Sequence, residues 1–163
     1  MTFAAFKNGR VAVKVVKTSS GACWGGALAV RRSDAWRCHS GKRIYDPCFA
    51  RAADAHIVFC PTRMPWVRRA VELKLSSALP ARFGNPRGSL TAGPPWALRT
   101  IDGKACIAAT GLTKTIGGRA VAYTCSGGGG LVGTPQTTSK LWRIRYVRGS
   151  RSPQWLQVAV AWW

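Results

Sequence analysis

Acidic residues are scarce in this chain. Only five of its 163 residues are Asp or Glu, against 25 Lys and Arg, and the formal net charge is +20. No acid follows Asp102, whereas eight basic residues do. Because most positive charges have no acidic partner within the chain, the sequence predicts a field that attracts polyanions such as nucleic acid, anionic lipid or an acidic cell-wall polymer.

Long apolar runs are also missing. No stretch of about 18 apolar residues occurs, which excludes an ordinary membrane-spanning helix. Residues 1–7 do not show the basic and then apolar pattern of a secretory signal peptide, so no signal peptide is visible. Apolar residues nevertheless make up 47% of the chain, which is enough for a packed core. From the length we expect residues 1–163 to form a single β domain.

The cysteines lack the C-x-x-C spacing of zinc fingers and thioredoxin-like motifs. Their even number favours three disulfides in an exported, extracellular protein. The pairing is open from sequence alone, but the simplest partition puts two bridges in the first half and joins Cys106 to Cys125. The cysteines are Cys23, Cys38, Cys48, Cys60, Cys106 and Cys125.

No long helical period appears, and short β-branched or alternating segments predict about nine strands. The expected fold is therefore all-β, an antiparallel sandwich or barrel stapled by disulfides, and a short helix is compatible with residues 47–55. The expected strands cover residues 11–16, 27–30, 56–60, 70–75, 96–101, 104–109, 119–125, 140–147 and 155–162.

The remaining segments are expected to be irregular. Residues 1–20 form an N-terminal strand and arm, and residues 19–26 and 31–56 are predicted as loop. Proline and glycine make residues 80–95 a long surface loop, and residues 127–139 contain a glycine run that predicts a flexible loop.

Enzyme motifs are scarce as well. Residues 128–133 match G-x-G-x-x-G, but Thr134 and Pro135 follow instead of a helix and no acid comes later, so a dinucleotide cradle is not expected. We expect neither a cofactor nor a metal site. The carboxyl groups of Asp34 and Asp46, with His39, are the available candidates for general acid–base catalysis of glycoside cleavage.

Two clusters interleave basic and aromatic residues, a pattern that suits phosphate contact combined with ring stacking. In residues 140–147 the alternation places Trp142, Ile144 and Tyr146 on one face and Arg143 and Arg145 on the other. The candidate binding residues are Arg31, Arg32, Trp36, Arg37, Lys42, Arg43, Arg143, Arg145, Arg148, Arg151 and Trp155.

Several motifs around the cysteines resemble a group of small secreted actinobacterial proteins of unknown function. The resemblance runs from about residue 21 to the C-terminus and implies an exported, disulfide-bonded β domain, without catalytic residues to transfer. The motifs are SDAWRC (33–38), IYDPCF (44–49), VFCP (58–61), PWAL (95–98), DGKAC (102–106) and YTC (123–125).

Three functions remain open from the sequence. The first is a secreted, non-enzymatic protein that binds an anionic surface or polymer through its Arg/Lys–aromatic clusters. The second is an extracellular hydrolase acting on a cell-wall or extracellular polymer. The third is a protein-interaction or assembly subunit with a protein partner, which an exposed Trp patch and an unpaired edge strand near Trp163 would support.

Overall fold

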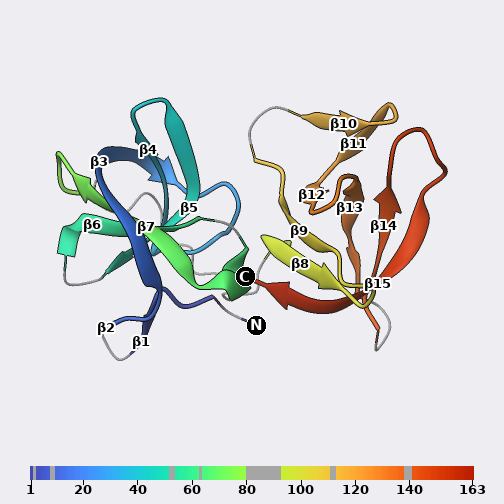
Figure 1. Ribbon diagram of the computed structural model, residues 1–163, viewed down its shortest axis with the longest axis horizontal. Coiled ribbons are helices and arrows are strands. Elements are labelled where there is room, and N and C mark those ends of the chain that lie inside the picture. The colour runs from blue at the N-terminus through green and yellow to red at the C-terminus, as the bar shows by residue number, and fades with distance from the viewer. Residues whose placement is uncertain are drawn as a thin grey trace. The chain divides into compact units, whose positions relative to one another are not determined.

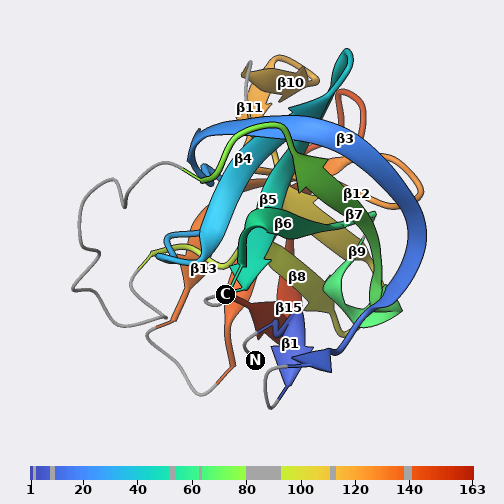
Figure 2. The same cartoon turned by 90° about the vertical axis from the view of Figure 1, so that its left-hand side faces the viewer.

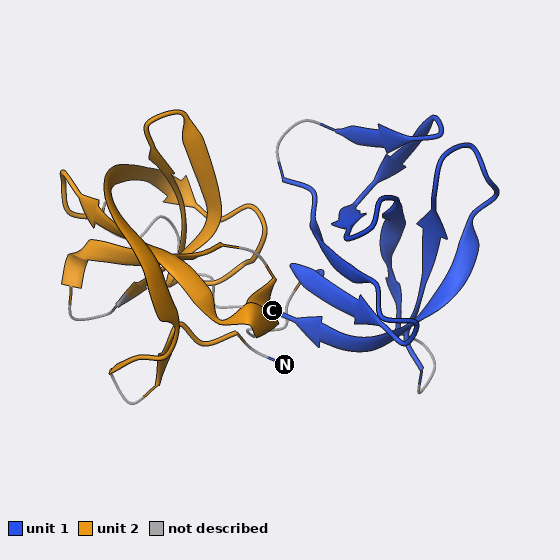
Figure 3. Cartoon of the chain, viewed as in Figure 1, with its two compact units in different colours: residues 1, 94–163 blue, residues 2–93 orange. Residues whose placement is uncertain are grey.

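The chain is built from β-strands. In its described ranges, the computed structural model contains fifteen strands, one short 3₁₀ helix and no α-helix. It divides into two compact units, unit 2 with residues 2–93 and unit 1 with residue 1 and residues 94–163 (Figure 3). The described residues are 1, 3–7, 10–51, 54–62, 64–79, 93–110, 113–137 and 141–163.

Unit 2 is a closed five-stranded barrel (Figure 1). Its strands follow chain order around the barrel, and every neighbouring pair is antiparallel except the parallel pair of the first and last strands. The first strand of the barrel, β3 (Lys14–Gly26), is long and curves around the unit (Figure 2). The strands are β3 (Lys14–Gly26), β4 (Ala35–Ser40), β5 (Arg43–Arg51), β6 (Asp54–Pro61) and β7 (Arg69–Leu75).

Alternating side chains build the core of unit 2. Val71, Leu73 and Leu75 of β7 are buried, as the sequence pattern predicts. Two disulfides join adjacent strands, Cys23–Cys38 between β3 and β4 and Cys48–Cys60 between β5 and β6. The core is thus stapled across two of its hairpins, which compensates for its small size.

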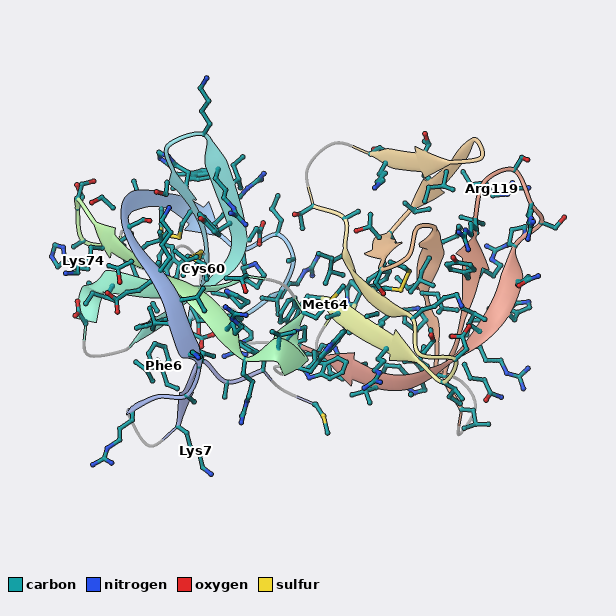
Figure 4. The ribbon with its side chains drawn as sticks, viewed as in Figure 1. Phe6, Lys7, Cys60, Met64, Lys74 and Arg119 are labelled. Atoms are coloured by element: carbon teal, nitrogen blue, oxygen red, sulfur yellow. A yellow bond between two sulfur atoms is a disulfide. The ribbon has the colours of Figure 1, made fainter. Side chains whose placement is uncertain are left out.

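Smaller elements complete unit 2. A two-stranded ribbon of β1 (Phe6–Lys7) and β2 (Arg10–Val11) precedes the barrel, and the 3₁₀ helix η1 (Pro65–Val67) lies between β6 and β7. Exposed basic side chains project from the unit, and Figure 4 labels Lys7 and Lys74 among them.

Unit 1 is a closed six-stranded barrel in which every neighbouring pair is antiparallel. A separate hairpin of β10 (Lys114–Ile116) and β11 (Arg119–Val121) lies between the barrel strands β9 and β12 in the chain. The barrel strands are β8 (Ala97–Thr100), β9 (Ala105–Ala108), β12 (Tyr123–Cys125), β13 (Gly130–Gln136), β14 (Arg143–Val147) and β15 (Gln154–Trp162).

The core of unit 1 gathers Leu98, Leu131, Ile144 and Tyr123, all fully buried or nearly so. The Tyr123 hydroxyl donates a 2.7 Å hydrogen bond to the carbonyl of Pro95, and burial raises the pKa of this phenol. The Cys106–Cys125 disulfide connects β9 to β12 at directly opposed positions. The expected partition of two early bridges and one late bridge is confirmed.

The largest differences from the sequence predictions lie in the first half. Residues 19–26, expected as a loop, belong to β3, and the loop predicted over 31–56 contains β4, β5 and the start of β6. In the segment compatible with a helix, residues 47–51 belong to β5 and residues 54–55 to β6. Their Ser, Gly and Ala content weakens β propensity, but each segment gains two strand neighbours and a disulfide. Residues 27–30, expected as a strand, form a turn region instead.

A further correction concerns the second half. The predicted flexible loop over 127–139 contains β13, because the glycine run forms a tight turn and residues 130–136 then pair with β12 and β14. The two compact units each close their own barrel around their own core. Most of the predicted 80–95 loop lies outside the described residues.

Candidate functional site

The outer face of the β14–β15 hairpin in unit 1 carries the second basic cluster. Ile144 and Tyr146 point into the core, so the intervening Arg143 and Arg145 are exposed on the opposite face, as predicted. Arg148 and Arg151, in the turn that joins the two strands, are also exposed. The structure therefore brings the four arginines of this cluster onto a single hairpin.

An exposed tryptophan lies within this group of arginines. Trp155 stands opposite Arg145 in the β14–β15 register, and the Arg145 guanidinium carbon is 5.9 Å from the centre of the indole ring. The Trp155 side chain is 52% exposed, so the ring is not part of the barrel core. Cross-strand partners share a face of the sheet, which holds the cation beside the aromatic surface. We call Arg143, Arg145 and Trp155, with Arg148 and Arg151, the hairpin face.

The hairpin face contains no acid. Gln157 is opposite Arg143, and Val132 of β13 is opposite Arg145 on the other side. Unit 1 contains nine basic residues but a single acid, Asp102. The Asp102 carboxylate accepts hydrogen bonds from Lys104 and Thr100, which hold its pKa below the usual value. The charge of the hairpin face is therefore not neutralised within its own unit.

The first basic cluster, in unit 2, is split by the fold. Arg32 is largely buried, pairs with Asp34 at 2.6 Å, donates to the carbonyl of Phe3 and lies over the ring of Phe49. Trp36 is buried among the barrel core residues. These two predicted binding residues therefore stabilise the interior, because the alternation of β4 directs Trp36 inward.

The remaining members of this cluster lie at the surface of unit 2. Arg31, Lys42 and Arg43 are exposed, and the Arg43 guanidinium lies over the ring of Tyr45 at 5.0 Å. Arg37 is partly exposed and packs against Trp24.

The three candidate catalytic residues have different surroundings. The Asp34 carboxylate is bound by Arg32, whereas the Asp46 oxygens accept hydrogen bonds from the backbone amides of Leu28 and Ala29. His39 is exposed, and its Nδ1 lies 3.3 Å from the carbonyl oxygen of Gly41. The two carboxylates thus bind different internal partners, an arrangement typical of structural acids rather than of an acid–base pair.

Asp46 is an unusual acid because its side chain is only 3% exposed. Desolvation raises its pKa, although the Ala29 and Leu28 amides and the charge of Arg37 act in the opposite direction. Nε of Arg37 lies 3.9 Å from Oδ2 of Asp46. A buried carboxylate with amide partners fixes the turn at residues 28–29 and the position of Arg37.

Trp24 is a candidate binding residue that is not among the residues predicted from the sequence. It lies in β3, is 48% exposed, and contacts both Arg37 and His39. The expected loop over 19–26 gave no reason to assign its ring to a face. No sequence signal assigns Trp24 to a face, because its exposure depends on an irregular register between Cys23 and Gly25 of β3 and their partners in β4.

Unit 1 also has a shallow groove of about 440 Å³. Trp142 and Trp163 form one side of it, with ring centres 5.5 Å apart in an edge-to-face arrangement, and Val158 and Val160 of β15 also line it. This groove contains none of the predicted site residues.

In the described ranges no three His, Cys, Asp or Glu side chains gather as a metal site requires. None of the described segments is a helix with the length and apolar character needed to span a membrane. Comparisons of this chain with protein-family models, with curated proteins and with solved structures gave no significant match.

Proposed function

We propose that this chain is an exported, non-enzymatic protein that binds an anionic polymer or surface through the hairpin face of unit 1. The observation that carries the proposal is the exposed pair of Arg145 and Trp155, held in register between β14 and β15 and flanked by Arg143. A guanidinium beside a flat apolar ring offers paired hydrogen-bond donors to an anionic group and a stacking surface to the adjacent part of the polymer.

The charge balance supports a polyanionic ligand. The 25 Lys and Arg residues of the chain are opposed by five acids. Only three ion pairs form among the residues that the structure describes, and they involve Arg32, Arg37 and Lys104. Unpaired surface cations repel one another, and a polymer that neutralises them releases its condensed counterions, which drives association.

Two further observations support export and binding rather than hydrolysis. The three disulfides are of the kind that persists in oxidising compartments. Asp34 and Asp46, the carboxylates that a hydrolase would use, are engaged by Arg32 and by backbone amides.

The test is a comparison of charge-matched variants of unit 1. Arg143→Gln with Arg145→Gln removes two charges from the hairpin face, whereas Lys114→Gln with Arg119→Gln removes two exposed charges from the β10–β11 hairpin. Fluorescence anisotropy would measure binding to oligothymidylate, long-chain polyphosphate and phosphatidylglycerol vesicles.

We expect the hairpin-face variant to bind more weakly than the control variant. For a single-stranded ligand, its plot of log affinity against log salt should become shallower by about 0.7 for each phosphate that the variant no longer neutralises. Equal weakening by both variants would mean that only total charge matters, and no binding of the unmodified protein to any of the three probes would overturn the proposal.

A further inference from the structure

A second aromatic surface surrounds the Cys23–Cys38 disulfide of unit 2. Cys38 is fully buried, and the residues on either side of it in β4, Arg37 and His39, lie on the outer face with Trp24 of β3. The Arg37 guanidinium carbon is 5.4 Å from the centre of the Trp24 ring, and the His39 ring centre is 5.5 Å from it. The disulfide therefore fixes the backbone beneath all three side chains.

A β-bulge sets the direction of Trp24. In the β3–β4 register Cys23 is opposite Cys38 and Gly25 is opposite Arg37, so Trp24 is the extra residue on β3. Bulges of this type redirect side chains and are common beside functional sites. Gly25 shares the face of Arg37, and a Cβ added to it would meet nothing within 4 Å. Open space thus remains above Gly25, the residue that follows Trp24 in β3.

The cation of this surface, the Arg37 guanidinium, lies against a buried acid. Arg37 is 21% exposed at its side chain, and its Nε faces the buried Asp46 carboxylate at 3.9 Å. In the part of the chain that the structure describes, this Nε has no hydrogen-bond partner. Asp46 thus orients the guanidinium while its own oxygens are occupied by the Leu28 and Ala29 amides.

We propose that Trp24, Arg37 and His39 form a second binding site, whose ligand is an unpaired base and adjacent phosphate of a single-stranded nucleic acid. This inference rests on the proposed function and names the class of its polymer. A half-exposed indole provides the stacking surface for a base, and Arg37 provides the cation for the neighbouring phosphate.

The charges near the site favour a nucleic acid over a neutral sugar. Sugar hydroxyls are bound by free carboxylates and amides beside the aromatic ring, but the nearby carboxylate, Asp46, is buried and already hydrogen-bonded. The turn that follows His39 instead carries the exposed cations Lys42 and Arg43. The hairpin face of unit 1 has the same combination of ring and guanidinium, so each unit offers one base and one phosphate contact.

The test uses Trp24→Ala in the full chain, with Val16→Ala as a control at another exposed apolar residue of β3. The probes are oligothymidylate, an abasic oligomer of equal length and polyphosphate. Trp24→Ala should weaken oligothymidylate binding by about five- to 150-fold, the range expected for one stacked base. Binding of the abasic oligomer and of polyphosphate, which carry no bases, should stay unchanged. Trp24→Phe should retain most of the affinity, and Val16→Ala all of it.

Gly25→Val gives an independent variant because a Cβ added at Gly25 would meet no atom within 4 Å apart from those of its chain neighbours. It should lower oligothymidylate binding while the melting temperature stays unchanged. If Trp24→Ala binds oligothymidylate like the unmodified protein, or weakens binding of all three probes equally, base stacking at this site is overturned and the proposed function stands. If the unmodified protein binds neither these probes nor phosphatidylglycerol vesicles, the proposed function fails as well.

Discussion

The two units reach similar surfaces by different structural routes. In unit 1 an even number of antiparallel strands closes the barrel, and the exposed ring of Trp155 meets Arg145 through regular cross-strand register. In unit 2 five strands close only because β3 and β7 run parallel, and Trp24 meets Arg37 through a bulge beside a disulfide. A guanidinium–indole pair can therefore arise from a regular strand pattern or from a local irregularity.

The largest expected effects come from the disulfides, each of which should act on its own unit. Cys48→Ala with Cys60→Ala opens a bridge that closes 12 residues of unit 2, and Cys106→Ala with Cys125→Ala opens one that closes 19 residues of unit 1. Each pair should destabilise its own unit by about 3 kcal/mol, since the unfolded chain gains freedom.

Residue-resolved hydrogen exchange would locate each loss. If either double variant lowers protection equally in residues 2–93 and 94–163, the units do not unfold separately, and the division into two stability units is wrong.

The next comparison sets the buried acid of unit 2 against the exposed acid of unit 1. Asp46→Ala leaves the Leu28 and Ala29 amides without their acceptor and should destabilise unit 2 by about 2 to 3 kcal/mol. Asp102→Ala removes a solvent-exposed ion pair with Lys104 and should change stability by less than about 1 kcal/mol. Urea denaturation of the two variants measures both values, and a larger effect at Asp102 would contradict the structural role of Asp46.

The smallest expected effect is the pH dependence of stability, which should have opposite signs for Asp46 and Asp102. Burial raises the pKa of Asp46 above 3.8 in the folded state, so its contribution is fully present below 3.8 and is lost as the pH rises through the folded pKa. The hydrogen bonds from Lys104 and Thr100 lower the pKa of Asp102, so its contribution is present above 3.8 and is lost as the pH falls through the folded pKa.

Urea denaturation at several acidic pH values, relative to Asp46→Asn and Asp102→Asn, separates these contributions. The advantage of the unmodified protein should fall with rising pH against Asp46→Asn and rise against Asp102→Asn. Parallel trends would show that Asp46 is not desolvated as the structure indicates.

Sequence patterns predict the regular parts of this molecule well. The alternation around Ile144 and Tyr146 correctly assigns Arg143 and Arg145 to the outer face, and the cysteine spacing predicts the early and late bridges. Asp102 and Gly103, a dipeptide typical of hairpin turns, lie in the connection between β8 and β9. These features depend on neighbours that are close in sequence or on a strict period of two.

The features that sequence could not predict depend on distant partners or on irregular register. β3 is Ser- and Gly-rich around residues 19–26 and forms a strand because β7 and β4 pair with it. The exposure of Trp24 requires the bulge, and the burial of Trp36 requires the closed barrel. A bulge shifts all later side chains to the opposite face, so period-two reasoning fails there.

The central claim is that exposed, unneutralised cations beside aromatic rings bind a polyanion. The most direct test is the affinity of the unmodified protein for oligothymidylate over a series of salt concentrations. The account predicts a straight, steeply falling plot of log affinity against log salt, with a slope of about −0.7 for each phosphate that the protein neutralises. Affinity that does not change with salt would contradict it, and so would a lack of binding at the lowest salt concentration to oligothymidylate, polyphosphate and phosphatidylglycerol vesicles alike.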